Sequence, residues 1–191
     1  LELEGGRWGV IASIRTFDLM VGQDFARLFR GVPPDPSFVD QRFQSVRHLR
    51  IPEWSDAEFD ELLSKIPALR IAVDNGGSKL AELARVPFNT RLLADLLSSG
   101  VAPEKFKDLA SQIQLLDMYW NERVRPLGAV AEQCLRSTVN AMIERGRMEA
   151  SRIAAGAGTA NILDQLQQAS VLISANGDRD VAFRHHILFD Y

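Results

Sequence analysis

The sequence predicts a mainly α-helical fold, with a small parallel α/β part near the start and a β-hairpin near the end. Two short apolar runs before Ser55 are separated by a helical stretch. Beyond Ser55, apolar residues recur at helical spacing over most of the chain. Near the end, Asn176-Gly177 lies between two further apolar runs, and this dipeptide is the strongest short hairpin signal.

The α/β part is expected over residues 1–54. Residues 8–15 (Trp-Gly-Val-Ile-Ala-Ser-Ile-Arg) are mostly apolar without sided alternation, which is typical of a strand buried on both faces. Residues 45–51 are a second strand candidate, and residues 23–29 between them have a helical pattern. The pattern predicts one βαβ unit at the edge of a parallel sheet, and we expect its other strands upstream because two strands alone are not stable.

A helical bundle is expected over residues 55–125. Ser55 and Glu58 are spaced as a capping box, in which each side chain satisfies a backbone N–H of the other residue. Periodic apolar residues and Gly, Ser or Pro breaks predict further helices over residues 69–74, 78–84, 87–97 and 103–124. Short helices joined by such turns form a compact bundle.

The last part, residues 126–191, is expected to be a winged-helix domain with a β-hairpin wing. A helix is predicted over residues 130–144, another around Ile153, and an amphipathic one that begins with Thr159 as its cap. The hairpin around Asn176-Gly177 follows. Helices followed by a β-hairpin give the element order of a winged helix.

Composition narrows the classes of function. The chain has 46% hydrophobic and 25% charged residues and a net charge of −3, which gives no electrostatic reason to expect nucleic-acid binding. The single cysteine, Cys134, excludes an internal disulfide and predicts a reducing, cytoplasmic location. No apolar run approaches the roughly 20 residues that span a bilayer, so we expect no membrane partner.

The run Val10-Ile-Ala-Ser-Ile-Arg15 resembles the sensor strand of STAND ATPases, the signal-transduction P-loop ATPases of AAA+, NACHT and NB-ARC type. In that family the strand delivers an arginine to the γ-phosphate of the nucleotide. The resemblance implies that Arg15 is this sensor, and a guanidinium fork matches phosphate oxygens well. The alternative is an arginine that ends a strand and pairs with Asp18.

Residues 83–93 resemble the family's lid motif, in which a proline at a helix start packs against the adenine. Pro87 is the matching residue. Its missing N–H costs little in the first turn, and its ring offers a rigid apolar face. A proline that merely opens a helix is the alternative.

Residues 181–191 are similar to the second wing strand and closing helix of the family's winged helix. There a histidine reaches the β-phosphate of ADP, and His185 occupies its place, followed by His186 where the family has an acidic residue. An imidazole N–H can donate to a phosphate oxygen. The alternative is a histidine packed at a helix start.

Together these resemblances imply the nucleotide-sensing portion of a STAND signalling ATPase that couples its ATP or ADP state to domain rearrangement. The resemblance also implies that the partner is the upstream P-loop core of the same chain, that the protein forms a homo-oligomer on activation, and that it has a role in bacterial antiviral defence. The chain begins with Leu1 and contains no Gly-rich phosphate loop or acidic magnesium strand, so we expect these elements, and the Mg²⁺ ligands, outside it. Alone it is not expected to be catalytic.

Two other classes remain open. One is a helical adaptor with a winged helix for protein contacts and no nucleotide. The other is a DNA-binding regulator, although the candidate recognition helix over residues 159–169 has no Lys or Arg and carries Asp164. A metal site is not expected, because adjacent His185 and His186 cannot face one point of a regular helix.

Overall fold

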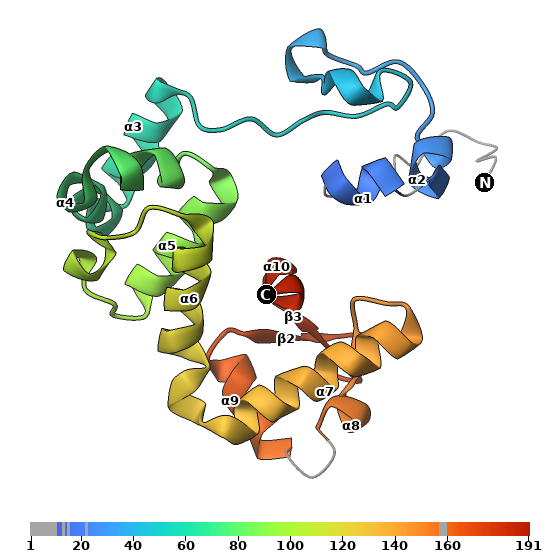
Figure 1. The fold of residues 1–191 in the computed structure, drawn as a ribbon, viewed down its shortest axis with the longest axis vertical. Coiled ribbons are helices and arrows are strands. Elements are labelled where there is room, and N and C mark those ends of the chain that lie inside the picture. The colour runs from blue at the N-terminus through green and yellow to red at the C-terminus, as the bar shows by residue number, and fades with distance from the viewer. Residues whose placement is uncertain (1–10, 13, 15, 22, 157–159) are drawn as a thin grey trace. The chain divides into compact units, whose positions relative to one another are not determined.

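A computed structural model describes residues 11–12, 14, 16–21, 23–156 and 160–191 of the chain. The chain divides into two compact units, Leu1–Pro52 and Glu53–Tyr191. The described residues are mainly helical and include a small three-stranded antiparallel sheet (Figure 1). This confirms the predicted mainly α fold with a β-hairpin. Among the described residues, no helix is both long enough and apolar enough to cross a membrane.

The first unit contains short helical elements joined by loops. Its α-helices are α1 (Thr16–Val21) and α2 (Gln23–Leu28), followed by the 3₁₀ helices η1 (Pro36–Phe38) and η2 (Gln41–Phe43). Helix α2 confirms the helix predicted over residues 23–29. Asp35 and Asp40 cap the two 3₁₀ helices by accepting hydrogen bonds from the backbone N–H groups of Ser37 and Arg42.

The strand predicted over residues 45–51 is not formed. The segment is a loop with one isolated antiparallel bridge, between Arg30 and Val46. Its backbone groups bond to loops and a helix end instead of a ladder: Arg47 N donates to Phe29 O at 2.6 Å, and Arg50 N donates to Phe38 O at 2.6 Å. Residues 45–51 have the apolar residues typical of a strand. In the described part of the chain, however, no neighbouring strand lies beside them to complete a sheet.

The other predicted strand, residues 8–15, lies largely outside the described residues, and its described members, Ile11, Ala12 and Ile14, are in no strand. In the described part of this unit, Leu19 and Val46 are the buried hydrophobic side chains. Large exposed ones are more numerous: Ile11, Met20, Phe25, Leu28, Val32, Phe38, Leu49 and Ile51. The described residues of this unit therefore have little core of their own.

The second unit begins with a bundle of four α-helices and one 3₁₀ helix among its described residues. They are α3 (Asp56–Lys65), α4 (Pro67–Ala84), α5 (Pro87–Ser98), η3 (Pro103–Phe106) and α6 (Gln112–Arg123). The predicted capping box starts α3, where Ser55 N donates to Glu58 Oε2 at 2.9 Å and Glu58 N donates to Ser55 Oγ. Gly77, with φ of 65°, interrupts α4 between the two helices predicted there.

The single long helix predicted over residues 103–124 is wrong. The segment divides into η3 and α6, with residues 107–111 between them. Ser111 has extended backbone angles and its hydroxyl accepts from Gln114 N, so it caps α6. A serine side chain that competes for backbone N–H groups starts a new helix in place of continuing the old one.

A winged helix follows α6. The 3₁₀ helix η4 (Arg125–Leu127) leads into α7 (Ala129–Arg145), β1 (Ala150–Ser151), α8 (Arg152–Ala155), α9 (Ala160–Gln168), β2 (Leu172–Ala175), β3 (Asp180–Phe183) and α10 (Ile187–Asp190). The antiparallel sheet has the order β1-β3-β2. This order of elements and strands is that of a winged helix. The predicted Thr159 cap lies outside the described residues.

The wing confirms the predicted hairpin. Leu172 pairs with Phe183, and Ala175 pairs with Asp180. Asn176 and Gly177 both adopt positive φ, at 51° and 65°, which is the conformation that this dipeptide favours in a tight turn. Strand β1 was not predicted, because a strand of two residues has no detectable alternation.

The bundle and the winged helix share one hydrophobic core. Its buried members run from Phe59 in α3 to Leu188 in α10 without division into separate clusters. The boundary predicted at residue 125 therefore lies inside one compact unit, Glu53–Tyr191, while the division between units follows Pro52. Side chains at the junction of the bundle and the winged helix are consequently held in a defined arrangement.

Candidate functional site

The structure places two of the three predicted site residues. Pro87 is the first residue of α5 in the bundle, and His185 lies between β3 and α10 in the winged helix. The ring of Phe88, the residue after Pro87, meets the His185 ring edge to face at 5.8 Å between centroids. Arg15 lies outside the described residues.

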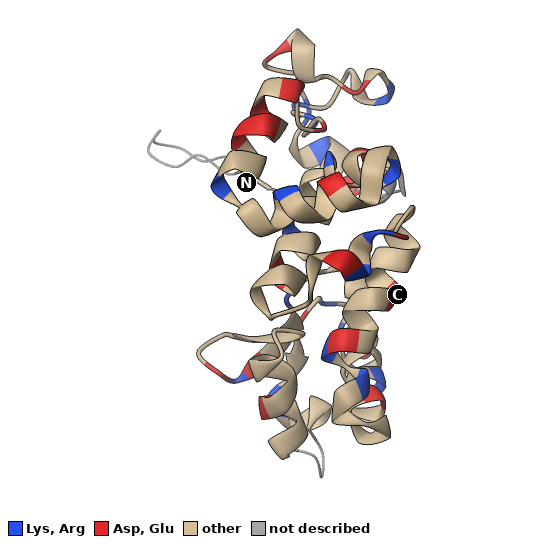
Figure 2. Ribbon diagram, turned by 90° about the vertical axis from the view of Figure 1, so that its left-hand side faces the viewer, with Lys and Arg blue, Asp and Glu red and all other residues tan. Residues whose placement is uncertain are grey.

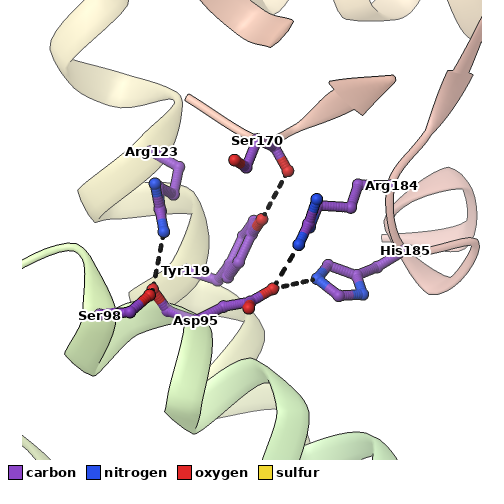
Figure 3. Close-up of polar contacts among 7 residues, drawn as sticks. All are labelled: Asp95, Ser98, Tyr119, Arg123, Ser170, Arg184 and His185. Carbon is purple, nitrogen blue, oxygen red and sulfur yellow. Dashed lines mark hydrogen bonds and ion pairs between the residues drawn. The ribbon is translucent and has the colours of Figure 1, made fainter. Parts of the chain in front are cut away.

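Asp95 of α5 is the polar partner of His185. His185 Nε2 lies 3.0 Å from Asp95 Oδ2, and Arg184 Nε lies 3.4 Å from the same oxygen (Figure 3). Because a carboxylate only accepts hydrogen bonds, the His185 Nε2–H is the donor. One carboxylate of the bundle therefore holds two consecutive residues of the winged helix.

Helical spacing explains how α5 presents both contacts. Phe88 and Asp95 are seven residues apart, so they lie two turns apart on one face of the helix. On the other side, Phe183 ends β3 with a buried side chain, and Arg184 N donates to Val171 O at 2.9 Å. The end of the central strand β3 thus fixes Arg184 and His185 opposite this face of α5.

Tyr119 of α6 completes the surroundings of His185. Its ring is fully buried and meets the imidazole edge to face, with centroids 5.6 Å apart. Its hydroxyl donates to Ser170 O at 2.9 Å, which ties α6 to the turn before β2 (Figure 3). The imidazole therefore contacts two aromatic rings from the bundle, and only 3% of the residue is exposed.

Arg123 binds the backbone carbonyl of Asp95. Its Nη2 donates to Asp95 O at 2.8 Å, and the same carbonyl accepts from Ser98 Oγ at 2.9 Å. The Arg123 guanidinium also lies 5.8 Å from the Tyr119 ring centroid. Two arginines therefore bind Asp95, Arg123 at its backbone carbonyl and Arg184 at its carboxylate.

The surroundings lower the pKa of His185 below its usual 6.5, chiefly because burial disfavours the charged imidazolium. Asp95 opposes this shift, while Arg91 and Arg184 add to it. Burial also raises the pKa of Tyr119. The arrangement favours a neutral histidine and a neutral phenol at the junction.

This arrangement does not offer a phosphate site at His185. The imidazole is buried, its Nε2–H is occupied, and the adjacent carboxylate would repel a phosphate. Cavities of about 380 and 870 Å³ lie elsewhere in the unit, and neither is lined by Pro87 or His185. A contact between His185 and ADP stays a prediction, and it requires a different arrangement of this junction.

The helix that a DNA-binding winged helix would use carries little to attract DNA. Helix α9 has no Lys or Arg, and Arg152 of the adjoining α8 pairs with its Asp164 and Gln167. Basic and acidic residues are intermixed along the ribbon (Figure 2). Among the described residues, no group of three or more His, Cys, Asp or Glu side chains is placed to hold a metal ion.

Sequence reasoning selected Pro87 and His185 but missed Asp95, Tyr119 and Arg123 as parts of the same cluster. Asp95 lies 90 residues before His185 in the sequence, so no local pattern joins them. Comparison of the chain with models of protein families, with curated proteins and with solved structures finds no match.

Proposed function

We propose that residues 53–191 are the lid and winged helix of a nucleotide-responsive, STAND-type switch, and that the first unit belongs to its nucleotide-binding core. The responsive element in this proposal is the junction formed by Asp95, Tyr119 and His185. The ATP or ADP would be held by a phosphate loop and Mg²⁺ ligands outside these 191 residues.

The observation that carries the proposal is the meeting of two motif regions from distant parts of the sequence. Phe88, next to the lid proline Pro87, contacts the winged-helix residue His185. The resemblance implies that these two motifs lie close together. A switch also needs contacts that differ between its states, and a buried polar junction supplies such contacts.

The apolar surface of the first unit supports the same proposal. Its described residues expose large hydrophobic side chains such as Phe25, Leu28 and Ile51. A segment with this surface is stable when further elements cover it. The missing strands of a P-loop core are the covering elements that we propose.

The second candidate is a helical adaptor that uses its winged helix for protein contacts and binds no nucleotide. The commitment of His185 Nε2 to Asp95 favours it, because a purely structural histidine would be bonded in this way. A DNA-binding regulator is less well supported, since α9 offers no cation to the phosphate backbone.

The test compares variants in the full-length protein that contains this chain. We expect the purified protein to retain bound ADP, and His185→Ala to lower the ADP retained per molecule. Arg15→Ala should abolish ATP-dependent assembly while it leaves ADP retention nearly unchanged. His48→Ala is the matched control, because His48 bonds within the loops of the first unit.

Nucleotide content is measured after denaturation of the purified protein, and assembly is measured by its mass in solution with ATP or ADP. Protein that carries no nucleotide and binds none would contradict the switch and favour the adaptor. Retention that is equal in the original protein and in His185→Ala would remove His185 from the nucleotide response.

A further inference from the structure

The first residues of the second unit are tied to the turn that precedes Pro87. Trp54 N donates to Arg85 O at 2.8 Å, and Arg85 Nη1 donates back to Trp54 O at 3.1 Å. Arg85 caps the end of α4, and Pro87 begins α5 two residues later. Both backbone polar groups of Trp54 are therefore bonded to one residue of the α4–α5 turn.

The indole of Trp54 makes a third contact with the same region. Its Nε1–H donates to Thr90 Oγ1 at 3.0 Å, and Thr90, near the start of α5, is only 4% exposed. The Thr90 hydroxyl has one proton to donate, and both Ala84 O and Val86 O lie within its reach. A chain of hydrogen bonds thus runs from Trp54 through Thr90 to the backbone of the α4–α5 turn.

Arg85 also joins the turn to α3. Its Nη2 bonds to Asp56 Oδ1 at 2.5 Å, and its guanidinium lies 5.1 Å from the centroid of the Phe59 ring. The Asp56 side chain is 90% exposed, so water screens this ion pair and it adds little to stability. The bonds to Trp54 contribute more, because Trp54 packs against the hydrophobic core and its partner Thr90 is buried.

The indole bond does more than end α4. The last carbonyls of a helix need partners. Asn89 Nδ2 donates to Leu83 O at 2.9 Å, and the hydroxyl of Thr90 reaches the next carbonyl. The Trp54 indole satisfies neither carbonyl. Its bond instead links the turn to the chain that enters the second unit, and this link is what a positioning role requires.

We infer that Trp54 is a positioning residue of the α4–α5 turn. Through Arg85 and Thr90 it sets where Pro87 lies relative to the chain that enters the second unit. A shift of residues 53–55 is then passed on to Pro87 and is not absorbed before it. This role of Trp54 rests on the proposed function, because Pro87 meets a nucleotide only there. The hydrogen bonds themselves need no nucleotide and can be tested separately.

Amide hydrogen exchange in the 191-residue chain tests the bonds at the turn. Trp54→Phe keeps an aromatic ring against the core but removes the indole N–H, and Thr90→Val replaces the hydroxyl by a methyl group. Each change should speed exchange of the Arg85 and Thr90 amides by up to about fivefold, the effect of losing one hydrogen bond. Thr90→Ser keeps a hydroxyl and should keep the original exchange rates.

Trp120→Phe serves as the control, because it removes an indole N–H from another helix of the bundle, α6. Exchange at the α4–α5 turn should be the same in this variant as in the original chain. Exchange of the α7 amides should be unchanged in every variant, and this separates a local effect at the turn from unfolding of the whole unit.

ADP retention by the full-length protein tests the link to Pro87. Trp54→Phe and Thr90→Val should lower the ADP retained per molecule, whereas Thr90→Ser should leave it unchanged. In a Pro87→Ala background, Trp54→Phe should cause no further loss, because its effect passes through Pro87.

Three results overturn the positioning role of Trp54. They are unchanged exchange at the turn in Trp54→Phe and Thr90→Val, unchanged ADP retention in these variants of a protein that holds ADP, and an equal loss from Trp54→Phe whether Pro87 is present or replaced. A protein that holds no ADP in any form contradicts the proposed function instead. The exchange rates alone then decide whether Trp54 holds the turn.

Discussion

The winged helix takes part in two polar side-chain pairs that differ in burial and in the elements that they join. On the side of α8 and α9, Arg152 pairs with Asp164, whose side chain is 55% exposed. On the side of the bundle, Asp95 binds His185, whose side chain is 2% exposed. The residues of the first pair are 12 positions apart in the sequence, and those of the second pair are 90 positions apart.

We expect burial and separation in sequence, more than the type of charge, to decide what such a polar pair contributes. A pair in water is screened and adds little to stability, because both ions were already well solvated. A pair at a buried junction makes each partner dependent on the other. We therefore expect changes at the bundle junction to alter the whole unit, and changes at α8 and α9 to be nearly silent.

The largest effect is expected from Asp95→Ala. It removes the acceptor of a buried imidazole and the partner of Arg184, and we expect a loss of about 2 kcal/mol in the free energy of unfolding. Urea denaturation followed by circular dichroism measures it. Asp74→Ala, at an exposed position of α4, should change the same quantity by less than about 0.5 kcal/mol. Equal losses in the two variants would contradict the proposed difference.

A pH effect is expected as the pH falls below 6.5. Since folding lowers the pKa of His185, the unfolded chain binds more protons in this range. The free energy of unfolding should thus decrease by up to about 1.4 kcal/mol per pH unit as the pH falls. The His185→Gln variant should lack this component, and subtraction of its pH curve removes the contribution of the carboxylates. Identical curves would show that His185 does not couple to folding.

Tyr119→Phe should have a smaller effect of about 1 kcal/mol. The variant keeps the ring against His185 but leaves Ser170 O without its donor. Tyr191→Phe is the matched control, because the Tyr191 hydroxyl bonds to Asp117 at an exposed position. Thermal or urea unfolding of both variants checks this order, and a larger loss in Tyr191→Phe would reverse it.

The smallest effect is expected from Asp164→Asn. The ion pair with Arg152 is solvated, so the free energy of unfolding should change by less than about 0.5 kcal/mol. If the change instead matched that of Asp95→Ala, the exposed pair and the buried pair would not differ as we propose.

Local signals in the sequence predicted local structure well. The Ser55–Glu58 capping box and the Asn176-Gly177 turn both form, because each depends on residues within a few positions of one another. The strand over residues 45–51 did not form, since a strand needs a partner that the pattern alone cannot supply. The break before α6 also depends on one capping side chain, Ser111, within a continuous apolar pattern.

The candidate site also depends on contacts that no local sequence pattern predicts. Pro87 and His185 were selected from motifs, and the structure brings their segments into contact through Phe88. Asp95 carries no motif, because its role comes only from the packing of α5 against the end of β3. A partner defined by tertiary packing could not be predicted from spacing along the chain.

A double-mutant cycle between Asp95→Asn and His185→Gln tests the central claim most directly, with the Arg152→Gln and Asp164→Asn cycle as its reference. The coupling free energy is the part of the double variant's loss that the two single variants do not explain. We predict about 1 kcal/mol or more for Asp95 with His185, and less than about 0.5 kcal/mol for Arg152 with Asp164. A coupling at the bundle junction no larger than that of the reference pair would contradict the account.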